Sequence, residues 1–201
     1  YPCLEFDLPK LRHNLSALSQ RCQMAGIRLA GAVKGVQSNP KLVQEYLPYC
    51  DQIAISRLSQ AKMLRQAGIT ADLLMLRLPM MSEIPELVAL TQYSLNSQFC
   101  VIRQIEEECK RQNKQHKVIL MADEGDLREG YWDKTQLIED ALRIEQQMQH
   151  VCLAGIGVNL GCYGSILPST QNLGDLVQIA REIEQRIGRK LEIVSGGATT
   201  S

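Results

Sequence analysis

The sequence predicts an α/β fold, a TIM-type (β/α)8 barrel that is truncated after its seventh barrel strand. Short apolar segments alternate with amphipathic helical segments, an order typical of a parallel sheet with right-handed crossovers. Seven such strands in succession, with no G-x-G-x-x-G run after the first, favour a barrel over an open dinucleotide-binding sheet. A complete barrel usually takes about 250 residues, whereas this chain has 201. We therefore expect the eighth strand to be missing.

The elements of the first half follow from the spacing of apolar residues and from residues that begin or end helices. Residues 3–6 are expected to form an opening strand set apart from the barrel, and Asp7 to cap a helix that Gly26 closes. Barrel strands are then expected at residues 29–33, 52–56, 72–78 and 93–96. Of the helices that follow them, the first is expected to begin at Pro40, and the second to turn Ala61, Leu64 and Ala67 inward and to be closed by Gly68. The next two are expected at residues 82–90 and 98–113.

The second half repeats this pattern with longer loops. Strands are expected at residues 117–122, 151–160 and 191–194, and helices at residues 134–149 and 172–187. Two polar, glycine-containing loops, residues 123–132 and 161–170, follow the first two of these strands. Residues 1–201 are therefore expected to form one incomplete barrel domain.

Composition narrows the class of protein. The chain carries 22 basic and 22 acidic residues, and no basic run suggests a surface for nucleic acid. No apolar run approaches the length of a membrane span and no signal peptide opens the chain, so a cytoplasmic protein is expected. The seven cysteines are scattered without C-x-x-C spacing, and the three histidines lack metal-ligand spacing. Neither a disulfide framework nor a metal site is expected.

Polar residues lie at or after the carboxyl ends of the predicted strands, where barrels carry their chemistry. These residues are Lys34, Ser56, Arg77, Asn96, Asp123, Arg128, Asn159 and Ser195. Each has an ordinary structural alternative, since aspartate and asparagine cap loops and arginines form surface ion pairs. Together on one rim they favour a functional site.

Two features of this rim suggest a cofactor. Lys34 ends a predicted buried strand, where loss of hydration favours the neutral amine that can form a Schiff base, although it could instead extend to solvent. The run Ser195-Gly-Gly-Ala-Thr-Thr-Ser201 offers backbone N–H groups and hydroxyls to a phosphate, although it could equally be a flexible tail. A lysine and a phosphate cradle on one rim are what pyridoxal phosphate (PLP) requires.

Several motifs carry a resemblance to a known family along the whole chain. They are Ala32-Val-Lys34, Leu76-Arg-Leu-Pro-Met80, Ser94-Leu-Asn-Ser97, His116-Lys-Val-Ile-Leu-Met121, Gly125-Asp-Leu-Arg-Glu-Gly130, Gly155-Ile-Gly-Val-Asn-Leu160 with Cys162-Tyr-Gly164, and Leu191-Glu-Ile-Val-Ser-Gly-Gly197. With these motifs the chain resembles the alanine racemase-like, PLP-dependent (fold type III) family, and within it the ornithine racemase branch.

The resemblance implies roles for individual residues. Lys34 would be the Schiff-base lysine and one of two catalytic bases, Arg128 would reach the phenolic oxygen of PLP, and Asn159 would lie against its ring. The phosphate would be bound by Ser195, Gly196, Gly197 and Thr199. Two residues depart from the alanine racemase pattern: Ser38 replaces a phosphate-binding tyrosine, and Met121 replaces a lysine that is often carbamylated.

The resemblance also implies an activity, the racemisation of ornithine or another basic amino acid by abstraction of its α-proton. Arg77, Asp123 and Tyr163 are candidates for binding that substrate. In the family a second base comes from a C-terminal β-domain of the other subunit of a homodimer, and this chain lacks that domain. Two alternatives remain: a PLP-binding barrel without enzymatic activity, and a cofactor-free domain in which Lys34 is structural.

Overall fold

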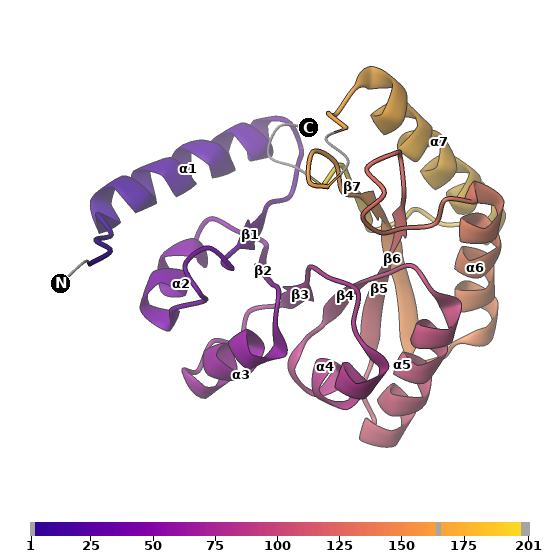
Figure 1. Cartoon of the computed structure of the whole chain (residues 1–201), viewed down its shortest axis with the longest axis horizontal. Helices are drawn as coiled ribbons and strands as arrows, with labels where there is room; N and C mark the ends of the chain where they lie inside the picture. Colours follow the sequence, from indigo (N-terminus) through magenta and orange to yellow (C-terminus); the bar gives the residue numbers. More distant parts are fainter. Residues whose placement is uncertain (1–2, 164–165, 198–201) are drawn as a thin grey trace. The chain divides into compact units, whose positions relative to one another are not determined.

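The computed structural model describes residues 3–163 and 166–197, in which strands and helices alternate along the chain (Figure 1). In chain order the elements are α1 (Leu8–Met24), β1 (Ala30–Ala32), α2 (Pro40–Tyr46), β2 (Gln52–Ile55), α3 (Leu58–Gln66), β3 (Leu73–Met75), the 3-10 helix η1 (Met81–Glu83), α4 (Ile84–Leu90), β4 (Tyr93–Asn96), α5 (Phe99–Gln112), β5 (His116–Ala122), α6 (Lys134–Gln147), β6 (Val151–Val158), α7 (Thr170–Ile187) and β7 (Ile193–Ser195). This βα alternation is the order that the sequence predicts.

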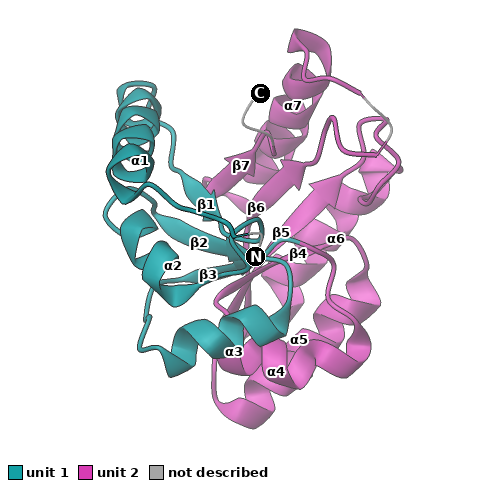
Figure 2. Ribbon diagram, turned by 60° about the vertical axis from the view of Figure 1, so that its left-hand side comes forward, with its two compact units in different colours: residues 1–76 teal, residues 77–201 magenta. Residues whose placement is uncertain are grey.

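The chain divides into two compact units, which are coloured separately in Figure 2. Unit 1 comprises residues 1–76 and unit 2 comprises residues 77–201. Within unit 1, β1 pairs with β2 and β2 with β3, all parallel. Within unit 2, β4 to β7 pair in chain order, also parallel. Parallel neighbours in chain order are the pattern of a barrel wall.

The sheet of unit 1 is covered by helix on the face that carries Gly31 and Val33. A side chain at Gly31 would lie 2.8 Å from Cys50 Sγ and 3.0 Å from Tyr46 Cδ1, so β1 and the end of α2 approach closely. Val33 is fully buried. Ala30 and Ala32 point the other way and are exposed. Successive residues of a strand face opposite sides, so Lys34, two residues after Ala32, follows this exposed face.

The sheet of unit 2 curves. Tyr93 on β4 donates a hydrogen bond of 2.8 Å from its hydroxyl to Glu192, which directly precedes β7. The Nζ of Lys117 on β5 donates to the same two side chains at 2.8 and 2.7 Å. Because β5 and β6 separate β4 from β7, this contact requires the four strands to bend around a common interior. Curvature of this kind is what closes barrels.

Several helix boundaries predicted from sequence are confirmed. Asp7 caps α1 by accepting the N–H of Lys10 at 3.0 Å, and Gly26 follows its last turn with φ of +68°. Gly68 follows α3 with φ of +79°. Positive φ costs glycine little because it has no Cβ.

Two strand predictions are wrong. Residues 3–6 are irregular and exposed, because no strand within the described ranges pairs with them and helix α1 begins at Leu8. The strand expected at residues 72–78 is only Leu73–Met75. Leu76 still donates to the carbonyl of Ile55 at 2.8 Å, and the chain then leaves the sheet towards Pro79, which has no N–H for a ladder.

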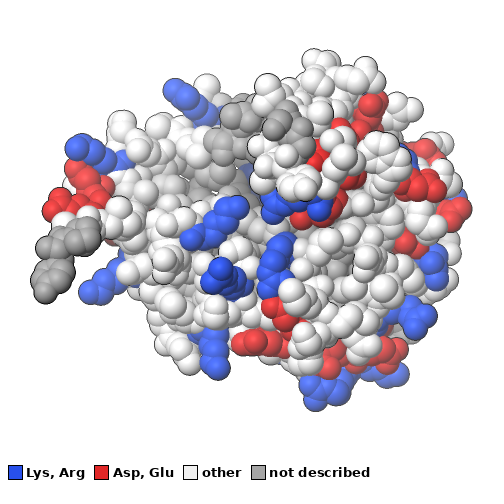
Figure 3. Space-filling view, viewed as in Figure 1, with Lys and Arg blue, Asp and Glu red and all other residues white. Residues whose placement is uncertain are grey.

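On the face of the molecule shown in Figure 3, lysine and arginine side chains are interspersed with aspartate and glutamate side chains. Ion pairs of unit 2 include Arg189 with Glu145 and Lys190 with Glu184, both at 2.6 Å. In the parts of the chain that the structure describes, no helix is both long enough and apolar enough to span a bilayer.

Candidate functional site

Lys34 opens a tight turn in unit 1. The N–H of Gln37 donates to the carbonyl of Lys34 at 3.1 Å, and the N–H of Ser38 donates to the carbonyl of Val33 at 2.9 Å. The side chain of Lys34 is exposed. Unit 1 therefore fixes the backbone of Lys34. It does not bury the amine, although a loss of hydration was expected for a lysine at a strand end.

Ser38 in the same turn has an unusual environment. It is completely buried, and its Oγ has no hydrogen-bond partner among the described residues. Ser38 and Gln37 both adopt positive φ, +56° and +49°, which non-glycine residues avoid unless their surroundings impose it. A buried hydroxyl without a partner costs free energy, and the fold of this turn bears that cost at Ser38.

In unit 2, Arg128 and Asn159 are joined by Glu129, an acidic residue that is not among the candidates taken from the sequence. The Nη1 of Arg128 lies 2.6 Å from Cys162 Sγ, and its Nε lies 3.4 Å from Glu129 Oε2. Glu129 Oε1 accepts a hydrogen bond from the Nδ2 of Asn159. We call these residues the Arg128–Glu129–Asn159 cluster. Glu129 directly follows Arg128 in a glycine-flanked run, but nothing in the sequence distinguishes it from a surface glutamate.

The loops after β5 and β6 are also joined by Asp126, which is buried. Its carboxylate accepts the backbone N–H groups of Cys162 at 3.3 Å, Tyr163 at 2.8 Å and Ile166 at 3.4 Å. This contact fixes the loop that carries Cys162 against Arg128. The side chain of Tyr163, a predicted substrate residue, is largely exposed.

Asp123 makes the contacts of a loop cap, which is the structural role that the sequence left open for it. Its Oδ1 accepts the N–H groups of Gly125 at 2.9 Å and Leu127 at 3.1 Å. Its backbone carbonyl accepts a hydrogen bond from Lys134 Nζ, which also pairs with Glu124 at 2.9 Å. These contacts leave the role of Asp123 towards a substrate as a prediction.

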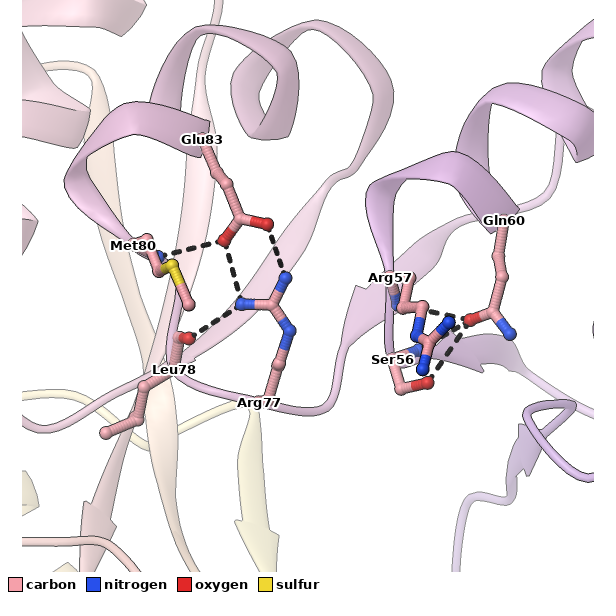
Figure 4. Close-up of polar contacts among 7 residues, drawn as sticks. All are labelled: Ser56, Arg57, Gln60, Arg77, Leu78, Met80 and Glu83. Atoms are coloured by element: carbon pink, nitrogen blue, oxygen red, sulfur yellow. Dashed lines mark hydrogen bonds and ion pairs between the residues drawn. The ribbon is translucent and has the colours of Figure 1, made fainter.

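Arg77, at the start of unit 2, forms a two-pronged ion pair with Glu83 (Figure 4). Nη1 and Nη2 donate to the two carboxylate oxygens at 2.8 and 2.5 Å, and Nη1 also donates to the carbonyl of Leu78 at 3.2 Å. These hydrogen bonds hold the pKa of Glu83 below its ordinary value. Arg77 is thus engaged in a rim ion pair, and its role towards a substrate carboxylate stays a prediction. In unit 1, the hydroxyl of Ser56 donates to Gln60 (3.3 Å), also shown in Figure 4.

The glycines after β7 lie against the end of β6. A Cβ at Gly197 would come within 1.7 Å of the Val158 carbonyl oxygen and 3.2 Å of Asn159 Cα, and its φ is +81°. Ser195 faces Gly157 across the pairing of β6 with β7. The structure thus brings the Ser195-Gly196-Gly197 run next to Asn159 and its cluster. The predicted phosphate ligand Thr199 lies outside the described residues.

The βα order and the parallel pairing of neighbouring strands within each unit define a barrel-type α/β protein. A family model for the alanine racemase N-terminal domain matches residues 6–201, and the chain belongs to that family.

Two curated relatives match nearly the whole chain. Ornithine racemase from Acetoanaerobium sticklandii is 35% identical over 202 residues, which cover 100% of this chain and 56% of the relative. Lysine racemase from Thermotoga maritima is 32% identical over 200 residues, which cover 99% of this chain and 55% of the relative. The chain thus spans little more than half the length of either relative.

Solved structures confirm the fold that the sequence predicts. Alanine racemase from Streptomyces lavendulae superposes with a TM-score of 0.78 at 17% identity, covering 94% of this chain and 50% of that one. PipY of Synechococcus elongatus PCC7942, solved with PLP bound, superposes with a TM-score of 0.69 at 15% identity, covering 92% and 90%. At such low identities the likeness concerns the fold alone.

Proposed function

We propose that this chain is the PLP-binding barrel domain of an amino-acid racemase that acts on a basic amino acid such as ornithine or lysine. The observation that carries the proposal is the identity, 35% and 32% over nearly the whole chain, to racemases of those two amino acids. The domain comprises residues 1–201. Catalysis by the whole protein, in the cytoplasm and as a homodimer, belongs to the same proposal.

The residues present fit PLP. The backbone at Gly197 leaves no room for a side chain, as expected where a main chain forms a phosphate cradle with Ser195 and Gly196. Arg128 supplies guanidinium N–H donors for an anionic oxygen, and its position is fixed by Cys162 and Glu129. In unit 1, Lys34 offers an exposed amine at the start of a fixed turn.

When bound, PLP withdraws electron density from the α-carbon of an amino acid, which makes its α-proton acidic. Lys34 would hold the cofactor covalently and, once displaced by the substrate amine, take or return the α-proton on one face. The opposite face needs a second base, because a proton removed and returned on one face restores the starting enantiomer. Arg128 would keep the cofactor's phenolic oxygen anionic, and Asn159 would lie against the ring.

Substrate selection is proposed for three further rim residues. Arg77 would pair with the α-carboxylate, although doing so requires it to share or leave Glu83. Asp123 would attract the side-chain ammonium of a basic amino acid by its charge. Tyr163, which is largely exposed, would contact the aliphatic part of the substrate.

The test uses the protein as its gene encodes it, incubated with PLP and reduced with borohydride. Peptide mass mapping is expected to find a pyridoxyl group on Lys34. The same protein, incubated with L-ornithine or L-lysine in deuterated water, is expected to yield deuterated D-enantiomer. An adduct on another lysine, or none, would contradict the proposed cofactor site. An adduct on Lys34 without deuterium incorporation would contradict the racemase.

A second candidate is a PLP-binding barrel without enzymatic activity. It is supported by the likeness to PipY, which covers most of both chains. It predicts the Lys34 adduct together with no exchange of α-protons for any amino acid tried. The identities to the two racemases favour the first candidate.

A further inference from the structure

Glu129 is more enclosed than Arg128 within the Arg128–Glu129–Asn159 cluster. Its side chain is 7% exposed, against 30% for Arg128. Burying a carboxylate is unfavourable unless its oxygens are paired. Here one oxygen faces Arg128 Nε and the other accepts from Asn159 Nδ2. Both partners are residues proposed to bind PLP, so the carboxylate of Glu129 holds two groups of the proposed cofactor site.

The contacts of Glu129 restrict the orientation of the Arg128 side chain. A guanidinium has five N–H donors in one rigid plane. With Nε at Glu129 and Nη1 at Cys162, two edges of that plane are fixed. The remaining donors must then point away from these two residues. A long arginine side chain held in one orientation loses less conformational freedom when it binds an anion.

The same carboxylate sets the orientation of Asn159. An ionised carboxylate only accepts hydrogen bonds, so it selects the amide nitrogen of Asn159 rather than the amide oxygen. Its contact with Nδ2 therefore turns Oδ1 to the opposite side of the amide. Without Glu129 the two orientations of the amide would be closer in free energy.

We propose that Glu129 is a positioning residue for cofactor binding, which fixes both the guanidinium of Arg128 and the amide of Asn159 before PLP arrives. The proposal rests on the proposed function, because it assumes that PLP binds at this rim. In this role Glu129 acts through Arg128 and Asn159.

The first measurement is the dissociation constant of PLP for Glu129→Ala, Glu129→Gln and Glu129→Asp, obtained by fluorescence titration. Glu129→Ala is expected to weaken binding about tenfold, the equivalent of one charge-assisted hydrogen bond. Glu129→Gln should fall between Glu129→Ala and the unchanged protein, and Glu129→Asp should recover part of the loss. The matched control is Glu124→Gln, an acid-to-amide change in the same loop at a residue paired with Lys134 rather than with the cluster.

The second measurement is the pH midpoint of the visible absorption of bound PLP. Glu129→Gln removes a negative charge beside Arg128 and so makes the site more positive. A more positive site disfavours the protonated form of bound PLP. The midpoint should therefore fall, and Glu124→Gln should leave it unchanged. A purely structural role for Glu129 would not move this midpoint.

The outcomes separate this proposal from the one on which it rests. If the unchanged protein binds no PLP, both proposals fail. Suppose instead that the unchanged protein binds PLP. If Glu129→Gln and Glu129→Ala then bind PLP within about twofold of that affinity and show the same pH midpoint of absorption, only the role of Glu129 is overturned. Equal effects of Glu129→Gln and Glu124→Gln would also overturn it, because they would reflect the charge of the loop rather than a position. Circular dichroism identifies any variant that fails to fold. If Glu129→Ala or Glu129→Gln does not fold, the affinity and midpoint of Glu129→Asp, compared with those of the unchanged protein, test the proposal instead.

Discussion

The two units of the chain differ in what they bury. Among the described residues, unit 1 buries two polar side chains, both serines, whereas unit 2 buries eight, of which four are ionisable: Glu108, His116, Asp126 and Asp140. The turn at Lys34 in unit 1 is held by backbone hydrogen bonds. The loops of unit 2 are held by carboxylates that join one loop to the next.

This difference separates the two halves of the proposed chemistry. The position of Lys34, the proposed nucleophile of unit 1, is set by backbone hydrogen bonds, which charge-neutralising substitutions do not remove. The proposed cofactor-binding groups of unit 2 depend on charged contacts, which respond to charge-neutralising substitutions and to pH. Substitutions in unit 1 should therefore alter covalent attachment, and substitutions in unit 2 should alter cofactor affinity and stability.

The largest expected effect is that of Lys34→Ala. Loss of the amine should abolish the borohydride-stable adduct and lower racemisation by about a thousandfold, since a positioned base contributes roughly that much. PLP should still bind without covalent attachment, because unit 2 is unchanged. The assay is peptide mapping with turnover in deuterated water, and Lys41→Ala serves as the control. Full activity in Lys34→Ala would show that Lys34, the residue that unit 1 contributes, is not needed for racemisation.

Gly197→Ala should have the next largest effect. A Cβ there would meet the Val158 carbonyl oxygen at 1.7 Å, and alanine disfavours a φ of +81°. The backbone must therefore shift, and the affinity for PLP should fall about a hundredfold, because the phosphate cradle is displaced. Gly174→Ala, where no atom lies within 4 Å of the added Cβ, should leave affinity unchanged. Wild-type affinity in Gly197→Ala would show that this glycine does not shape the cradle.

His116 should make the stability of unit 2 sensitive to acid. Burial lowers the pKa of His116 from 6.5 to about 4, and its Nε2 lies 2.9 Å from Ser94 Oγ. A lowered histidine pKa stabilises the fold above the unfolded pKa, and this contribution is lost as pH falls towards 4. From linkage, it should diminish by about 2 kcal/mol between about pH 7.5 and pH 5.

Urea unfolding at these two pH values measures the effect. His116→Gln should show a smaller loss on acidification than the unchanged protein, whatever its absolute stability. His13→Gln, at an exposed position, should behave like the unchanged protein. An identical pH dependence in His116→Gln would contradict a buried neutral histidine.

Asp126→Asn should have the smallest effect. The amide keeps one acceptor oxygen but replaces the other with a donor, which faces the backbone N–H groups of residues 162–166. A cost of about 1 kcal/mol is expected, seen as about fivefold faster hydrogen exchange at Cys162, Tyr163 and Ile166. Asp133→Asn, a helix cap that contacts Thr135 and Gln136 instead, should leave these amides unchanged. Unaltered exchange in Asp126→Asn would show that the loop holds without this carboxylate.

Local signals predicted most of the element boundaries. The Asp7 cap, Gly26 and Gly68 lie where the sequence placed helix ends, because capping and positive φ are decided by neighbouring residues. The prediction of an opening strand at residues 3–6 is wrong because neighbouring residues alone do not decide whether a strand forms. Its apolar pattern is local, but a strand needs a partner, and the described part of the chain offers none there.

The candidate site was predictable only in part. Lys34, Arg128, Asn159 and the glycine run follow strand ends, and strand ends can be read from hydrophobic pattern. Glu129 was not found, since an exposed glutamate and a buried one look alike in sequence. The pairing of Arg77 with Glu83 was likewise one of two open possibilities until their atoms were placed.

The sequence by itself determined the βα order, the family and which residue types follow each strand, because these depend on periodicity and on motifs within one segment. Tertiary structure alone decided which of those residues meet. Glu129 and Asn159 are thirty positions apart and touch only because β5 and β6 pair in parallel. The pairing of charged groups is set by distances of a few ångströms, and only the folded chain fixes such distances.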